Sequence, residues 1–211
     1  ALYLTFSKGS LLLAVPAALL FLALVRGGRR AWLGVGSGLI LLGTALIPIS
    51  RTARFRNTFS LQPGSTAFFR VKVWQSAWRI LREHPLTGLG PDNFLYRYRT
   101  RYILPEAWAE PNLSHPHNVV LNFGVRLGVG GIAVLVWLGG RFWWSAWRGY
   151  VRHTDPQMRS LLLGLMGGMV AFWVHGMVDN AFFLTDLAYT FFLSLGIAEI
   201  LNDRSAFAKP L

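Results

Sequence analysis

The sequence predicts an all-α membrane protein: a polytopic transmembrane helix bundle of about five spans with one long, partly helical extracytoplasmic loop. Two observations support this prediction. Of the 211 residues, 53% are hydrophobic, with a mean hydropathy of +0.40, and the apolar residues gather in blocks. A membrane-spanning helix needs about 20 predominantly apolar residues. Five blocks approach or reach this length, and the last is short: 2–25, 31–49, 118–140, 160–178 and 187–201. We interpret residues 1–211 as a single transmembrane domain.

Short basic loops between these blocks predict the orientation of the chain. Cytoplasmic loops of membrane proteins carry an excess of lysine and arginine. Seven arginines fall in two such loops: Arg26, Arg29, Arg30, Arg141, Arg148, Arg152 and Arg159. Both loops should therefore be cytoplasmic, which leaves the long segment 50–117 and the short connection 179–186 on the outer side of the membrane.

The net charge of +12 would suggest nucleic acid as the partner of a soluble protein, but the seven loop arginines are orientation signals. The outer segment carries ten other basic residues against four acidic ones, an excess of 10 − 4 = 6 positive charges: Arg51, Arg54, Arg56, Arg70, Lys72, Arg79, Arg82, Arg97, Arg99 and Arg101. Such an excess indicates an anionic partner, for which Arg51 and Arg54 are candidate ligands. The chain has no cysteine, which excludes disulfides and thiolate chemistry.

The outer segment contains one predicted helix, residues 68–83, which Pro85 ends. Its apolar side includes Trp74 and Trp78, its polar side includes Ser76, and Arg70 falls in the middle of the apolar side. An unpaired buried charge is expensive, so Arg70 must either extend past the helix end to water or meet an anion. The alternating aromatic and basic run 96–102 is interpreted as a partly exposed strand or helix turn with solvated arginines; stacking on sugars or bases is the alternative.

His117 lies where the proline-rich stretch 105–116 enters the apolar block 118–140. At helical spacing, His117 shares one face with Leu121, Gly124, Gly128 and Gly131, which leaves a smooth strip beneath the imidazole. A general base could operate there, because the ordinary pKa of histidine suits proton transfer near neutral pH. A packing or hydrogen-bonding role is the alternative. The glycines, with those of the block 160–178, are expected to allow close helix packing.

His115 and His117 also raise the question of a metal. Histidine ligands on a helix are usually four residues apart rather than two, and no cysteine or neighbouring carboxylate is arrayed with this pair. The sequence therefore predicts no metal site.

Two further charged groups lie near the outer ends of the predicted spans. His175 and Asp179 are four residues apart and should be neighbours on one helix face. An intramembrane ionisable pair indicates function, although Asp179 could instead orient the following turn. Lys8 lies near the outer end of the first span, where it could reach water or present a cation to the same outward cavity.

The order of these motifs resembles the O-antigen ligase and polymerase superfamily. His117-Asn118, nine residues, Gly128, two residues and Gly131 is similar to that family's signature of His, a polar residue, x9, Gly, x2 and Gly. Arg70 and Trp74, followed by the run from His84 to Phe94, resemble its outer loop. Residues 6–9 are similar to its Ser-Arg-Gly element, with Lys8 in the arginine position, and residues 175–186 to its last outer turn.

This resemblance implies a GT-C-type glycosyltransferase of the bacterial inner membrane, of which the chain resembles the C-terminal half. Such enzymes transfer a glycan from an undecaprenyl-pyrophosphate carrier to a lipid, polysaccharide or protein acceptor. His117 would be the base or acceptor-orienting histidine, and Asn118 is the second residue of that motif. Arg70 and Lys8 would hold the pyrophosphate, and no metal or cofactor would be needed. Arg126 stands where many relatives carry glutamate, a difference expected to alter helix pairing more than chemistry.

The sequence is also compatible with two other functions. The chain could be a non-catalytic accessory subunit of a larger membrane complex, packing against a separate N-terminal half or another subunit. It could also be a transporter, since some relatives are labelled bicarbonate transporters. A permeation path would need polar residues along several spans, whereas the ionisable groups here gather at outer helix ends.

Overall fold

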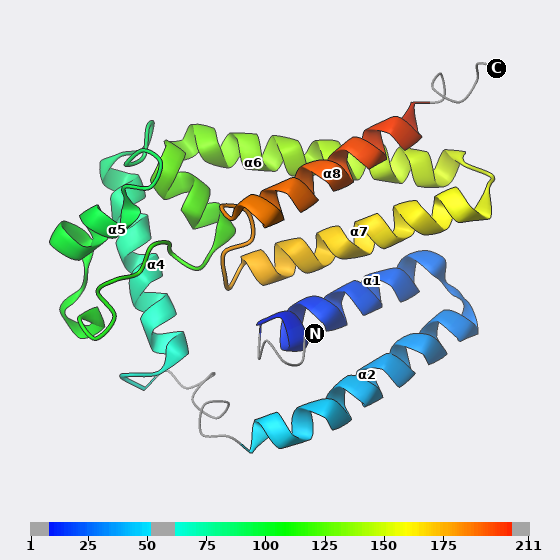
Figure 1. Cartoon of the computed structure of the whole chain (residues 1–211), viewed down its shortest axis with the longest axis horizontal. Coiled ribbons are helices and arrows are strands. Elements are labelled where there is room, and N and C mark those ends of the chain that lie inside the picture. The colour runs from blue at the N-terminus through cyan, green and yellow to red at the C-terminus, as the bar shows by residue number, and fades with distance from the viewer. Residues whose placement is uncertain (1–8, 52–61, 204–211) are drawn as a thin grey trace. The chain divides into compact units, whose positions relative to one another are not determined.

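The computed structural model describes residues 9–51 and 62–203, and this part of the chain is helical without strands (Figure 1). The principal helices are α1 (Val15–Arg26), α2 (Gly28–Ser50), α4 (Thr66–Glu83), α5 (Phe94–Arg97), α6 (Val119–Arg152), α7 (Pro156–Gly176) and α8 (Thr185–Asn202). Short irregular helices cover Ser10–Ala14, Tyr98–Tyr102 and Pro105–Ala107. The predicted all-α class is confirmed.

Three of the described helices are long and apolar enough to cross a membrane: Gly28–Pro48, Val119–Arg152 and Pro156–Gly176. Residues Ser10–Arg26 form a shorter apolar helix. These helices agree with an all-α membrane bundle. The division into five spans and their boundaries stays a prediction.

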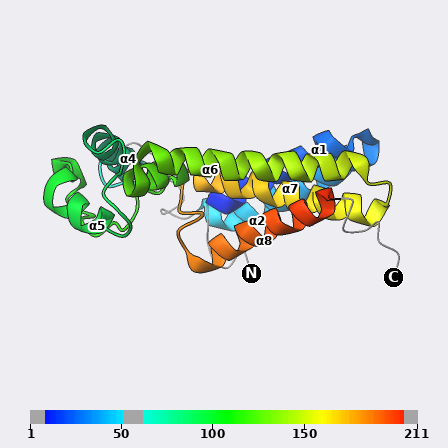
Figure 2. The same cartoon turned by 90° about the horizontal axis from the view of Figure 1, so that it is seen from above.

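The chain forms two compact units. The first contains residues 9–37, 136–175 and 181–203 of the described chain, so it comprises α1, the start of α2, the second half of α6, α7 and α8. The second half of α6 runs alongside α7 and α8 in Figures 1 and 2. Their shared core is apolar: Phe142, Ala146, Leu162, Leu163, Met166, Met169, Phe191, Ala198 and Leu201.

Polar contacts also connect these helices. The Arg141 guanidinium donates to both carboxylate oxygens of Glu199, at 2.6 and 2.7 Å, and thus links α6 to α8. The backbone of α7 approaches α1 closely at Gly167, where an added Cβ would lie 3.0 Å from the Leu22 side chain. The expected close packing therefore holds at this glycine.

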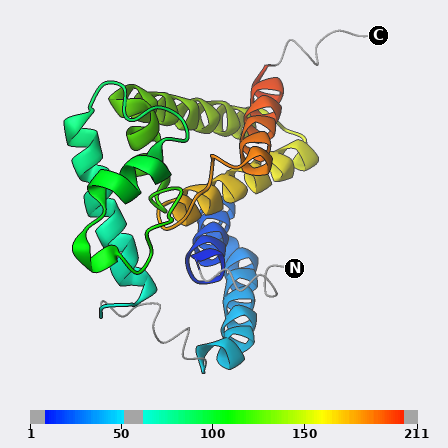
Figure 3. The same ribbon diagram turned by 60° about the vertical axis from the view of Figure 1, so that its left-hand side comes forward.

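The second unit contains residues 38–51, 62–135 and 176–180 of the described chain. Figure 3 brings its outer segment, with α4 and α5, forward. Its core joins these elements to the start of α6: Val73, Ala77, Ile80, Phe94, Tyr98, Tyr102 and Val125. The run 96–102 is helical with exposed arginines, as one interpretation expected, but Tyr98 and Tyr102 are buried in this core.

The apolar face of α4 differs from the expected one. Trp78 is 50% exposed, whereas Ser76 is buried and donates a 2.7 Å hydrogen bond to the Tyr102 carbonyl oxygen. A buried polar group is tolerated when it is hydrogen-bonded. This bond to the following segment explains why a serine, rather than the tryptophan, faces the core.

Helix α6 is broken at Gly128, whose φ of 68° and ψ of −160° are not helical. The break frees backbone groups that a neighbouring turn then pairs. The Val129 N–H donates to the Pro85 carbonyl at 2.7 Å, while the Val125 and Arg126 carbonyls accept from Leu89 at 2.8 Å and Gly90 at 3.0 Å. A Cβ at Gly128 would collide with the backbone of Pro85 and Leu86. The turn after α4 is thereby held in the bend of α6.

The bend at Gly128 shows that the predicted helical strip of glycines below His117 is wrong. His117 precedes α6 with a φ of 50°, and Gly128 interrupts the helix, so the five residues do not share one continuous helical face. The spacing of the sequence singled out the histidine and the glycines. It could not show that Gly128 packs against the backbone of the turn after α4, at Pro85 and Leu86, and not against another helix.

Candidate active site

His117 is positioned by the residue that follows it. The Asn118 side-chain oxygen accepts from the Leu121 N–H at 3.0 Å and so caps the start of α6. Its amide nitrogen donates to the Met177 carbonyl at 3.0 Å. Asn118 therefore holds together the helix start below His117 and the segment 176–180; its predicted contact with substrate stays a prediction.

Asp179 lies on that segment and faces the histidine. Nδ1 of His117 is 3.1 Å from Oδ1 of Asp179, and the backbone N–H of Asn180 donates to the same oxygen at 2.8 Å. A carboxylate accepts hydrogen bonds, so His117 carries its proton on Nδ1. In the neutral ring, Nε2 then has the lone pair that a general base requires.

The electrostatics of Asp179 favour its ionised form. Burial alone would raise the pKa of this carboxyl, but His115, His117 and the N–H of Asn180 hold the pKa far below its ordinary value. Asp179 is therefore a carboxylate at neutral pH. It can stabilise a positive charge that forms on His117.

Arg70 reaches the other side of the same carboxylate. Its Nη2 atom is 3.9 Å from Oδ2 of Asp179, and its side chain is 25% exposed. The Ser65 hydroxyl caps α4 by accepting from the Phe68 N–H at 3.2 Å and thus fixes the turn that carries Arg70. Of the two possibilities for Arg70, the structure shows the second: the guanidinium meets an anion, here a protein carboxylate.

His115 completes the cluster. Its Nε2 atom is buried, has no hydrogen-bond partner among the residues that the structure describes and lies 3.9 Å from Oδ1 of Asp179, while its ring centroid is 4.3 Å from that of His117. Ligand atoms of His115, His117 and Asp179 lie within 4.8 Å of one another, so these residues could hold a metal ion. The sequence argument against a metal missed this set because Asp179 comes 62 residues after His117.

A polar chain leads away from Asp179 through α6. Asn180 accepts from the Asn122 amide at 3.4 Å, and Asn122 in turn accepts from Nε of Arg126 at 3.0 Å. Arg126 is 8% exposed and also donates to Asp92 in the outer turn. Arg126 thus connects α6 to the outer segment; its expected effect on helix pairing stays a prediction. The i, i+4 spacing of Asn122 and Arg126 is the sequence signal that could have indicated this chain.

The predicted partnership of His175 with Asp179 on one helix is wrong. Helix α7 ends at Gly176, so Asp179 lies in the following turn and not one helical turn above His175. Nδ1 of His175 instead lies 3.3 Å from the Ser10 hydroxyl. His175 thus contacts the short helix Ser10–Ala14, and not Asp179 as expected.

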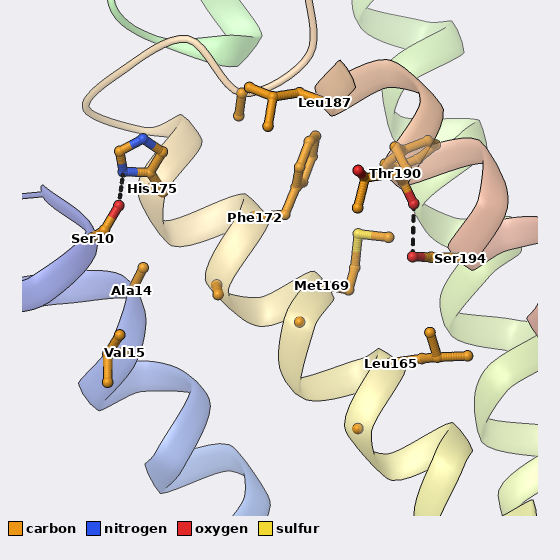
Figure 4. A pocket seen from close by; sticks show the side chains of 15 residues that line it. Ser10, Ala14, Val15, Leu165, Met169, Phe172, His175, Leu187, Thr190 and Ser194 are labelled. Atoms are coloured by element: carbon orange, nitrogen blue, oxygen red, sulfur yellow. Dashed lines mark hydrogen bonds between the residues drawn. The ribbon is translucent and has the colours of Figure 1, made fainter. Parts of the chain in front are cut away.

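His175 and Ser10 lie at an apolar cavity of about 360 Å³ in the first unit (Figure 4). Its walls come from residues 10–15, α7 and α8, including Ala14, Met169 and Phe172. Thr190 and Ser194 donate their hydroxyl protons to carbonyls of their own helix. The cavity therefore offers apolar surface with few free polar groups.

The remaining predicted anion ligands are not part of the histidine cluster. Arg51 is exposed at the end of α2, and it makes no described contact with His117 or Asp179. Lys8 and Arg54 lie outside the described residues. Their roles stay predictions.

Comparison with known proteins identifies relatives of this chain. A sequence model described as O-antigen ligase matches residues 1–136, which include Arg70 and His117 but not Asp179. An O-antigen ligase from Salmonella typhimurium is 28% identical over 146 residues, covering 64% of this chain and 35% of that protein. The chain thus aligns with about a third of the length of this relative.

Proposed function

Because the chain belongs to the O-antigen ligase family, we propose that it transfers a glycan from an undecaprenyl-pyrophosphate carrier to a hydroxyl of a lipid, polysaccharide or protein acceptor. The reaction takes place at the outer face of a bacterial inner membrane, on which the outer segment lies. The observation that carries this proposal is the 3.1 Å contact of His117 with Asp179, with Arg70 on the opposite oxygen of that carboxylate.

His117 acts as the general base. Its Nε2 atom takes the proton of the acceptor hydroxyl as that oxygen attacks the anomeric carbon of the donor. A new glycosidic bond forms while the bond from the anomeric carbon to the phosphate oxygen breaks, and the undecaprenyl pyrophosphate departs. A single displacement of this kind inverts the anomeric centre, and it needs no metal.

Asp179 keeps His117 in the tautomer that this step requires. The carboxylate holds the proton on Nδ1 and stabilises the imidazolium after proton transfer, as the carboxylate of a catalytic triad does. Its low pKa keeps it charged over the whole range in which the histidine operates.

Arg70 stabilises the departing pyrophosphate. A guanidinium presents a planar fork of N–H donors that matches phosphate oxygens. Its contact with Asp179 is long, at 3.9 Å, and its side chain is partly exposed, so it can turn toward an incoming phosphate. Lys8, Arg51 and Arg54 are proposed to add positive charge for the same anion.

The lipid part of the substrate has a separate requirement. The cavity beside His175 suits a hydrocarbon chain, since its lining is apolar, the hydroxyls of Thr190 and Ser194 are bonded to helix carbonyls, and that of Ser10 contacts His175. We assign His175 a place at this cavity rather than in the proton transfer.

A reconstituted transfer assay tests this function. The full chain is placed in liposomes with an undecaprenyl-pyrophosphate-linked glycan and a lipid acceptor, and product is measured for the wild type, His117→Ala and Arg70→Ala. We expect transfer by the wild type and a loss of about 100-fold or more in each variant. His84→Ala is the matched control, because His84 belongs to the same outer segment and its ring contacts the Tyr102 hydroxyl rather than a member of the histidine cluster.

Normal transfer by both variants, with insertion and helicity unchanged, would exclude the mechanism. If the wild type transfers nothing by itself but restores transfer to a second membrane protein, the chain is an accessory subunit. That alternative is retained because the chain covers 35% of the length of its relative.

A further inference from the structure

We propose that His115, His117 and Asp179 form an inhibitory site for a divalent cation of the zinc class. The site would accept the cation through two imidazole nitrogens and one carboxylate oxygen, all within 4.8 Å of one another. Two nitrogens and one oxygen favour zinc over calcium and magnesium, which prefer oxygen ligands.

The geometry of the three ligand atoms is close to that of a tetrahedral site. Bonds of about 2.0 to 2.2 Å place the ligand atoms of zinc about 3.3 Å apart. Nδ1 of His117 already lies 3.1 Å from Oδ1 of Asp179, and Nε2 of His115 lies 3.9 Å from the same oxygen. The three ligand atoms lie within 4.8 Å of one another, so a movement of the His115 ring toward the other two ligands would complete the set, and the fourth position would be open to water.

His115 has the properties of a metal ligand. Its Nε2 atom is buried without a hydrogen-bond partner in the described part of the chain, which is a costly arrangement for a polar atom. Its other nitrogen, Nδ1, lies 3.0 Å from the Ser114 hydroxyl. When a cation takes the place of a proton on Nε2, Nδ1 can donate to that hydroxyl and Nε2 presents its lone pair to the cation. Outer hydrogen bonds of this kind commonly orient histidine ligands.

Arg70 limits the affinity of this site. Its guanidinium lies 3.9 Å from Oδ2 of Asp179, so it competes with a cation for the same carboxylate. Metal binding should therefore be reversible, in contrast to that of a structural zinc site.

The inhibitory effect follows from the tautomer of His117 and rests on the proposed function. A cation on Nδ1 takes the lone pair there, so the single proton of the neutral ring moves to Nε2. Nε2 can then no longer accept the proton of an acceptor hydroxyl. The cation also occupies the carboxylate oxygen that stabilises the imidazolium.

Zinc binding to the full chain in detergent, without donor or acceptor, tests the site. Competition with a chromogenic chelator should give one zinc ion per chain. Affinity should fall more than about tenfold in His115→Ala, His117→Ala and Asp179→Asn, since even outer-shell changes cost 10- to 100-fold. His84→Ala, a histidine of the same segment outside the cluster, should bind as the wild type does.

Arg70→Gln tests the site in a way that does not depend on a loss of binding, because a misfolded protein would not bind zinc more tightly. Removing a unit charge about 4 Å from the ligand carboxylate should tighten zinc binding about fivefold or more. Three results would each overturn the proposal: the wild type binds no stoichiometric zinc ion, the three ligand variants bind zinc as tightly as the wild type does, or Arg70→Gln binds zinc more weakly than the wild type.

A second measurement separates this inference from the proposed function. Zinc should inhibit transfer by the wild type, and a chelator should restore the rate. Binding without any transfer would leave the metal site standing and contradict the glycosyltransferase. Transfer that zinc does not slow, despite stoichiometric binding, would contradict the inhibitory part of the inference alone.

Discussion

His117 and Asp179 are 62 residues apart in the sequence, yet Nδ1 of the histidine lies 3.1 Å from a carboxylate oxygen of the aspartate. The contact forms because Asn118 caps α6 and also bonds to the Met177 carbonyl, two residues before the aspartate. One asparagine thus positions both members of the pair. We expect the two residues to function as a unit.

Arg70→Gln should slow transfer about 100-fold, because the departing pyrophosphate loses a guanidinium partner. Arg70→Lys should recover part of the rate, since it restores the charge without the bidentate geometry. The measurement is kcat and KM in the reconstituted assay. Arg82→Gln is the control: Arg82 lies on the same helix, is exposed and stacks on Trp78 at 5.4 Å. An equal loss in Arg82→Gln would assign the effect to general surface charge.

The lowered pKa of Asp179 predicts a pH-dependent contribution to stability. A carboxyl whose pKa is lower in the folded state than in the unfolded chain stabilises the fold above its unfolded value, about 3.9. This contribution is lost as the pH falls through the lower folded value. The thermal midpoint of Asp179→Asn should therefore lie below that of the wild type at pH 7 and approach it below about pH 4. A difference that stays constant down to pH 2 would contradict an ionised Asp179.

Gly128→Ala should destabilise the second unit by about 2 kcal/mol or more, because strained backbone and a steric collision combine there. The φ of Gly128 is positive, and a Cβ would meet the backbone of Pro85 and Leu86. Gly130→Ala is the control, since a Cβ at that position has no neighbour within 4 Å. Thermal unfolding in detergent measures both variants. Equal midpoints would show that the bend of α6 does not depend on the glycine.

The proposed orientation can be measured with single cysteines, since the chain has none of its own. Glu110 and Thr154 are both exposed, on the outer segment and on the connection between α6 and α7. Glu110→Cys should react with a membrane-impermeant maleimide in intact cells. Thr154→Cys should react only after the membrane is opened, and the reverse pattern would invert the topology.

The sequence predicted the all-α class because apolar blocks of about 20 residues, separated by short basic loops, are typical of membrane-spanning helices. It also identified His117 and Arg70, through motif spacing and through an arginine on an apolar helix face. It could not predict the partner of His117, because the segment 176–180 joins the second unit only through tertiary contacts. The pairing of His175 with Asp179 failed for a local reason: helical spacing was extended past Gly176, where the helix ends.

The rest of the site depends on backbone groups that no side-chain pattern reveals. The bend at Gly128 exposes the Val125 and Arg126 carbonyls, which then bind the turn after α4. Arg126 is consequently buried beside that turn and bonded to Asp92. The sequence shows that Arg126 is a charged residue in an apolar segment. It does not show the break at Gly128 or the contact with Asp92.

The most direct test of the account is a double-mutant cycle on His117 and Asp179, measured as kcat/KM for glycan transfer. If Asp179 acts through His117, His117→Ala and Asp179→Asn should each lower the rate steeply, and the double variant should be no slower than His117→Ala alone. Independent effects that multiply in the double variant would contradict the proposed pair.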